Sequence, residues 1–116
     1  MTINVANISI IMFAVGAHGV AHAVNVFDDL DLPTALVARD AVQTALETHA
    51  SGEPLYWNVR DVAQGVVIPR RTWRSETGHW CREFEENIQD SDGRSQSTVA
   101  IRCRAKDGRW KIPGGE

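Results

Sequence analysis

Cys81 and Cys103 are the residues of this sequence with the most reactive side chains, and their spacing predicts a disulfide. The turn-forming residues 90–94 lie between them and fold two extended runs into a β-hairpin. A three-residue loop with Gly93 left-handed would place the cysteines opposite each other, with Cβ atoms about 4.5 to 5.5 Å apart, close to what a disulfide requires. A two-residue Asp-Gly turn would instead place Cys81 opposite Arg104, so the pairing depends on the loop.

A disulfide would indicate an oxidising compartment, whereas two buried reduced thiols would indicate the cytosol. On one strand His79 and Cys81 share a face about 7 Å apart, too far for a direct hydrogen bond. His18 and His22 have the helical spacing of metal ligands, but no third ligand accompanies them. We therefore expect no catalytic residue, no metal site and no cofactor. An enzyme that uses Cys81 and His79 is the weakest hypothesis and would need a free thiol of depressed pKa.

Arginine and tryptophan side chains gather around the two cysteines. Such a face could hold a peptide or an acidic ligand, although four tryptophans in a small chain more often pack in the core and on the sheet surface. Glu83 and Glu85 beside the arginines indicate a solvated cross-strand charge ladder. The candidate binding face consists of Arg82, Arg102, Arg104, Trp57, Trp73 and Trp80.

The composition is that of one ordinary globular domain. The 116 residues are 43% hydrophobic and 23% charged, with a net charge of -3. Residues 28–61 hold seven acids against two bases, whereas residues 70–111 hold ten bases and seven acids. Because acids interrupt the arginines throughout the second part, we expect no nucleic-acid partner.

Residues 1–23 predict a secretory signal peptide. An apolar run, 8–17, is followed by Ala21-His22-Ala23, which resembles a cleavage site with a mature chain starting near Val24. No Lys or Arg precedes the run, so an apolar N-terminal helix is the alternative. The run is shorter than the roughly 20 apolar residues that span a membrane. Residues 24–116 then form a single domain.

This domain is predicted to be α+β, one amphipathic helix packed on an antiparallel meander of about five strands. The helix runs from Pro33 to about His49, with a left-handed cap at Ser51-Gly52. Its apolar face comprises Ala38, Ala41, Val42, Ala45 and Leu46. The predicted extended runs are 55–57, 65–75 (with Pro69 indicating an edge or a bulge), 79–89, 95–104 and 110–112, and residues 58–65 are predicted to connect the first two.

Six short motifs follow one another in this region. They are Gly52, Trp57-Asn58, Gly65-Val66-Val67-Ile68-Pro69, Cys81-Arg82-Glu83-Phe84, Cys103-Arg104 and Asp107-Gly108-Arg109-Trp110. Their order resembles the C-terminal domain of the rickettsial-type outer-membrane surface antigen family, the seventeen-kilodalton antigens. The Gly-Val-x-Pro motif of that family has one residue more here.

The resemblance implies an exported, non-enzymatic envelope domain with a structural or interaction role, in the periplasm or at the outer membrane or cell surface. Family members often carry a lipoprotein cysteine and a glycine-zipper segment before this domain. Both cysteines here fall in the predicted sheet, so we expect no lipid anchor in this sequence. Expected partners are other envelope components or a peptide. The alternative is a periplasmic ligand- or peptide-binding, inhibitor-like module that uses the Arg/Trp-rich face.

Overall fold

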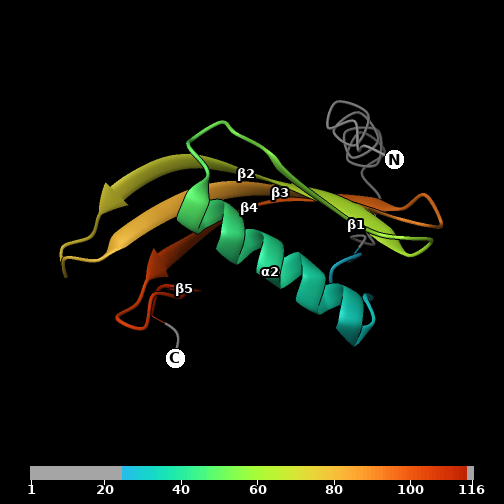
Figure 1. Cartoon of the computed structure of the whole chain (residues 1–116), viewed down its shortest axis with the longest axis horizontal. Coiled ribbons are helices and arrows are strands. Elements are labelled where there is room, and N and C mark those ends of the chain that lie inside the picture. The colour runs from blue at the N-terminus through green and yellow to red at the C-terminus, as the bar shows by residue number, and fades with distance from the viewer. Residues whose placement is uncertain (1–24, 115–116) are drawn as a thin grey trace.

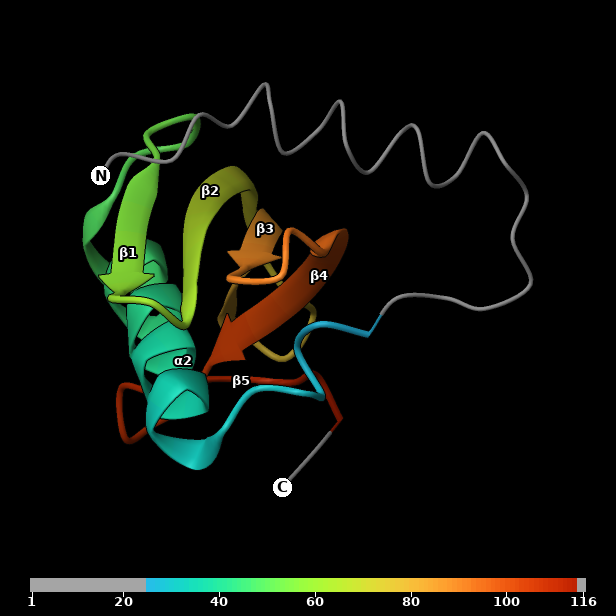
Figure 2. The ribbon, with the colours of Figure 1, turned by 90° about the vertical axis from the view of Figure 1, so that its right-hand side faces the viewer.

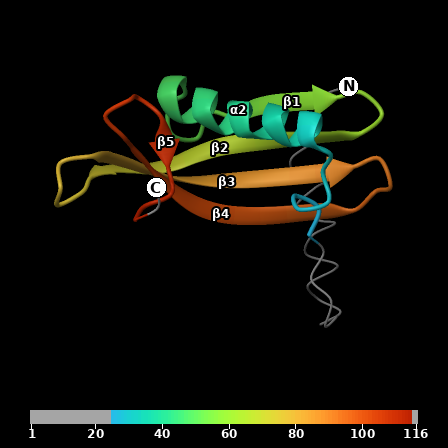
Figure 3. The ribbon, with the colours of Figure 1, turned by 90° about the horizontal axis from the view of Figure 1, so that it is seen from below.

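The computed structural model describes residues 25–114, and the prediction for residues 1–23 lies outside this range. The described chain contains one helix followed by five antiparallel strands, which confirms the α+β class (Figure 1). The elements are α2 (Leu32–Thr48), β1 (Leu55–Val59), β2 (Ala63–Arg74), β3 (Trp80–Asp90), β4 (Ser95–Arg104) and β5 (Trp110–Lys111). Strands β1 to β4 lie side by side in chain order (Figure 3), and the short strand β5 pairs with the end of β4.

Helix α2 begins at an acidic cap and ends before the predicted glycine. The Asp31 carboxylate accepts a hydrogen bond from the Thr34 backbone N–H, and Pro33 occupies the first turn, where its missing N–H costs nothing. The prediction of a left-handed cap at Ser51-Gly52 is wrong, because the C-cap is His49 in an extended conformation. Gly52 is left-handed, with φ of 87°, in the turn that follows.

The β1–β2 hairpin is tighter than predicted. We expected residues 58–65 to be a connection, but Asn58 pairs with Gln64 and Val59 with Ala63, so the turn is short. Asp61 takes the left-handed conformation in this turn, with φ of 63°, which aspartate tolerates better than most residues.

The β3–β4 hairpin has the three-residue loop that places the cysteines opposite each other. The Asp90 N–H donates to the Arg94 carbonyl at 2.9 Å, and Gly93 is left-handed with φ of 84°. The resulting register pairs Cys81 with Cys103, so the alternative pairing of Cys81 with Arg104 does not occur.

Strand β2 contains the bulge that Pro69 indicated. Its register with β3 shifts between Pro69 and Thr72. Because β1 pairs only as far as Val67, the second half of β2 has a strand neighbour on one side alone. The Pro69 carbonyl accepts a hydrogen bond at 2.7 Å from the Gly52 N–H, which ties the segment after α2 to the bulge.

The core lies between α2 and one face of the sheet, which curls around one side of the helix (Figure 2). The buried helix residues are Thr34, Ala38, Ala41, Val42, Ala45 and Leu46. Phe84 and Ile88 from β3 are fully buried in the same cluster. The Trp57 indole ring lies on Gly65 of the neighbouring strand, where any Cβ atom would overlap the ring. The absence of a side chain at Gly65 therefore makes room for Trp57 in the core.

Candidate functional site

A disulfide joins β3 to β4. Cys81 and Cys103 form the S–S bond, with Cα atoms 4.0 Å apart. Cys81 is buried and Cys103 is half-buried. The Nδ1 atom of His79 lies 3.1 Å from the Arg104 carbonyl oxygen. Because its sulfur is bonded, Cys81 holds no free thiol that could act as a nucleophile in this state.

The candidate site residues divide between the two faces of the sheet, because side chains alternate along a strand. Arg82 pairs with Arg102 on the face that α2 covers, since Arg82 shares parity with the core residue Phe84. Cys81, Glu83 and their cross-strand partners point to the opposite face. The helix-side face therefore holds Arg82 and Arg102, and the other face holds the disulfide.

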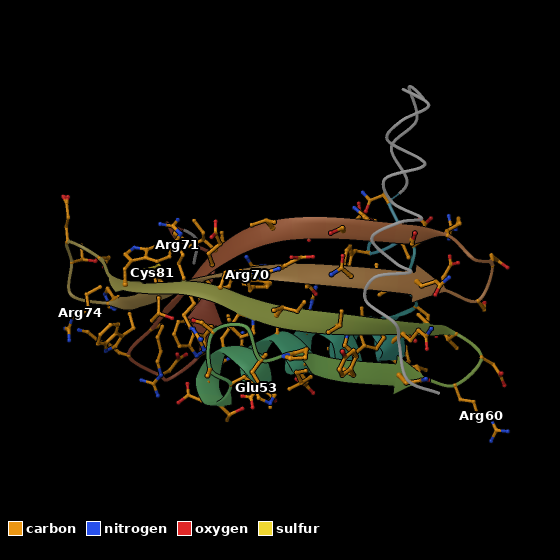
Figure 4. The ribbon with its side chains drawn as sticks, turned by 90° about the horizontal axis from the view of Figure 1, so that it is seen from above. Glu53, Arg60, Arg70, Arg71, Arg74 and Cys81 are labelled. Atoms are coloured by element: carbon orange, nitrogen blue, oxygen red, sulfur yellow. A yellow bond between two sulfur atoms is a disulfide. The ribbon has the colours of Figure 1, made fainter. Side chains whose placement is uncertain are left out.

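The predicted charge ladder between these arginines and Glu83 and Glu85 is wrong for this reason. Both glutamates pair with arginines of the β2 bulge instead. Arg71 Nε lies 3.1 Å from Glu83, and Arg70 forms an ion pair with Glu85. Figure 4 shows the disulfide face of the sheet, with α2 behind it, and labels Arg70, Arg71 and Cys81. The bulge presents two successive arginines to one face, which regular alternation would not do.

Arg82 binds the C-terminal end of α2. Its Nη1 donates to the Leu46 carbonyl at 2.8 Å and to the His49 carbonyl at 2.7 Å, and its Nε donates to Thr72 Oγ1 at 2.9 Å. The last carbonyls of a helix lack intrahelical donors and carry partial negative charge, so a guanidinium stabilises them. Arg82 is only 7% exposed, and burial lowers its pKa.

Arg102 is directly opposite Arg82 but makes different contacts. Its guanidinium carbon lies 5.4 Å from the centre of the Phe84 ring, and its Nη1 donates to the Ile101 carbonyl at 3.0 Å. Glu86 lies on the same face. Burial raises the pKa of Glu86 to about 7, although attraction to Arg102 partly opposes this effect.

Arg104 connects the sheet to α2. Its Nε lies 3.0 Å from Glu47 Oε1, and the Trp110 indole N–H donates to the same oxygen at 2.9 Å. The hydrogen bonds from Arg104 and then from Trp110 lower the pKa of Glu47, which therefore stays ionised at neutral pH. Gln43 also binds both backbone groups of Trp110, so β5 is fixed to the helix.

These contacts surround a shallow depression of about 320 Å³ at the C-terminal end of α2. It combines three of the predicted residues, Trp80, Arg82 and Arg104, with side chains from the helix and from β2 and β5. We call it the Arg82 depression. Its lining residues are Leu46, Glu47, Thr72, Trp80, Arg82, Arg104 and Trp110.

The remaining predicted residues lie elsewhere. Trp57 is buried in the core, and Arg102 lies over Phe84. Trp73 pairs with Cys81 on the opposite face, where Arg71 lies 4.9 Å from its ring centre. The sequence analysis missed Glu47 and Trp110 as site residues. No local pattern places a helix carboxylate beside β5, so only the tertiary fold could reveal them.

Among the described residues 25–114, no cluster of three or more His, Cys, Asp or Glu side chains could hold a metal ion. No helix within that range is long and apolar enough to cross a membrane.

The fold and the disulfide define a small α+β domain with one helix packed on a disulfide-bonded antiparallel sheet. Residues 44–111 match the family described as 17 kDa outer membrane surface antigen. The chain belongs to this family, which confirms the resemblance drawn from its motifs.

Curated relatives include the 17 kDa surface antigens of Rickettsia conorii, Rickettsia prowazekii and Rickettsia bellii, which are 37%, 35% and 32% identical over 71 residues. Each match covers 60% of this chain and 44% of the relative, so the chain spans less than half the length of these proteins. No solved structure matches the chain.

The four residues of the Cys81-Arg82-Glu83-Phe84 motif have four different roles in this fold. Cys81 forms the disulfide and Arg82 binds the helix end. Glu83 pairs with an arginine of the bulge, and Phe84 fills the core. Each residue of the motif thus joins β3 to a different part of the domain.

Proposed function

We propose that this is a non-enzymatic domain exported to the bacterial envelope, in the periplasm or at the outer membrane or cell surface, where it has a structural or interaction role. Family membership supports the location, since the relatives are named surface antigens. The observation that carries the proposal is the disulfide between Cys81 and Cys103. Structural disulfides form and persist in oxidising compartments, and the envelope is one of them.

The disulfide also supports a non-catalytic role. Both cysteines of the chain are bonded to each other. The bond closes a loop with a sequence separation of 22, worth about 3 kcal/mol by the chain-entropy estimate. In a domain of this size that is a substantial share of the total stability. We therefore assign the cysteines to folding rather than to chemistry.

A ligand- or peptide-binding module is the second candidate, favoured by one observation. Arg82 is a buried cation that lines a surface depression, and among the described residues no carboxylate lies within 4.0 Å of it. This arrangement would give the envelope domain an interaction role at one defined place.

Intact-mass spectrometry of the full chain expressed in a bacterial host, combined with cell fractionation, tests the main proposal. We expect the protein in the envelope fractions, with a chain that starts near Val24 and takes up no alkylating reagent until it is reduced. The double variant Cys81→Ser, Cys103→Ser is the control for alkylation. A cytoplasmic chain alkylated at both cysteines without reduction would contradict both export and the disulfide.

A further inference from the structure

The Arg82 depression is built from five different elements. Helix α2 contributes Leu46 and Glu47, and each of the strands β2 to β5 contributes at least one residue. Most of these side chains are fixed by hydrogen bonds or ion pairs to another element. The walls are therefore positioned by the fold itself.

Within this depression, Arg82 retains hydrogen-bonding capacity. A guanidinium has five N–H donors on three nitrogens. Nε and Nη1 make the three bonds to Thr72 and to the helix end, whereas Nη2 makes no hydrogen bond within the described residues. All three acceptors are neutral oxygens. The buried charge is thus balanced only by dipoles, and an anion would compensate it more completely.

The charges that line the depression add up to one positive charge. Glu47 and Arg104 form an ion pair with each other and cancel. Arg82 then supplies the excess. An apolar wall stands beside it, because Trp80 is 47% exposed and its ring is held by Arg74, whose guanidinium carbon lies 5.1 Å from the ring centre. One cation beside an exposed indole suits a monoanion that carries an apolar group.

We propose that the Arg82 depression binds a monocarboxylate whose adjacent apolar side chain packs against Trp80. The carboxylate accepts hydrogen bonds from Arg82 Nη2 in the charge-assisted geometry that guanidinium and carboxylate groups favour. This inference rests on the proposed interaction role and names the chemistry of its ligand.

A titration of the full chain by NMR tests the inference with N-acetyl-leucine as the probe. N-acetyl-leucine amide is the uncharged control, and inorganic phosphate is the alternative anion. The indole N–H signals of Trp80 and Trp110 and the Nε–H signal of Arg82 report binding at the depression. We expect saturable shifts with the acid, and affinity about tenfold weaker for the amide, since the charge-assisted hydrogen bonds are lost.

Two substitutions change the charge of the depression in opposite directions. Glu47→Gln leaves Arg104 without its carboxylate and should tighten acid binding, whereas Arg104→Gln leaves Glu47 uncompensated and should weaken it. Trp80→Ala should weaken binding about fivefold or more through loss of the apolar wall. Trp73→Ala is the matched control on the opposite face and should leave the affinity unchanged.

Equal shifts with the amide, tighter binding of phosphate than of the acid, no saturable shift, or the same change for Glu47→Gln and Arg104→Gln would overturn the inference. Each variant is compared only if its NMR spectrum shows the native fold. Because the two charge variants affect exposed side chains, they keep the test valid if Trp80→Ala unfolds the domain. The export experiment has an independent result, so failure of carboxylate binding and failure of the envelope location are distinguishable.

Discussion

Glu86→Gln should make the domain less sensitive to pH between pH 5 and pH 8. Glu86 lies on the core side of β3, paired with Val67 on one side and Thr98 on the other. Burial raises the pKa of its carboxyl group to about 7 from an ordinary value of 4.5, and attraction to Arg102 does not cancel this effect. The folded protein therefore binds this proton more tightly than the unfolded chain does.

The sign and size of the effect follow from this difference. The proton-linked stability is fully present below pH 4.5 and is lost as the pH rises through 7, because the folded state must then bury a charged carboxylate. At about 1.4 kcal/mol for each pH unit between the two pKa values, the full loss is about 3 kcal/mol. Glutamine at position 86 has no titrating proton, so its contribution to the free energy of unfolding should not change with pH.

Urea unfolding of the wild type and of Glu86→Gln at pH 5 and pH 8 measures this effect. The free energy of unfolding of the variant relative to the wild type should rise by about 2 to 3 kcal/mol between the two pH values. Glu85→Gln is the matched control on the opposite face. Burial alone would raise the pKa of Glu85, but hydrogen bonds from Arg70 and Asn87 outweigh burial and lower it. The effect of Glu85→Gln on the free energy of unfolding should therefore stay the same from pH 5 to pH 8.

An unchanged difference between the wild type and Glu86→Gln across this range would refute the reasoning. Such a result would mean that Glu86 ionises at an ordinary pKa, with water or Arg102 supplying full compensation. A difference that falls as the pH rises would show that the ionised form of Glu86 stabilises the fold.

Three other substitutions test the structural roles assigned above. Replacing Cys81 and Cys103 by serine should lower the free energy of unfolding by about 3 kcal/mol, measured by urea denaturation, and adding reductant to this variant should cause no further change. Arg82→Met should cost about 2 to 4 kcal/mol because it leaves buried helix carbonyls unpaired, and thermal unfolding should show that Arg82→Lys recovers only part of the loss. Gly65→Ala should destabilise by about 2 kcal/mol or more and should increase the exposure of Trp57 to fluorescence quenchers, and a native quenching profile would contradict the close packing of the ring.

The features that the sequence predicted correctly depend on local chemistry. The loop 91–93 contains the glycine that its left-handed position requires, and the register of β3 and β4 follows from that loop alone. The tight β1–β2 turn was missed because Asp61, rather than a glycine, takes the left-handed conformation there. Aspartate signals such a turn less clearly.

The errors about the site have two separate causes. Side-chain alternation already separates Arg82 from Glu83, so the predicted charge ladder conflicted with a rule that was available from the sequence. The true partners of Glu83 and Glu85 could not be predicted from the sequence, because Arg70 and Arg71 reach one face only through the bulge after Pro69. Long-range contacts such as the one between Glu47 and Trp110 depend on how β5 meets the helix.

The position of the disulfide also determines how the domain would respond to tension. A force that pulled the two ends of the chain apart would enter β3 at Cys81 and pass through the S–S bond directly to Cys103. Residues 82–102 lie inside the covalent loop and would carry none of this load. The pull would therefore not extend most of β3 and β4, whereas the hydrogen bonds from Arg82 to the end of α2 would have to break, because α2 lies outside the loop. A pull that separates the outer strands would therefore extend the rest of the domain and leave the segment between the two cysteines covalently closed.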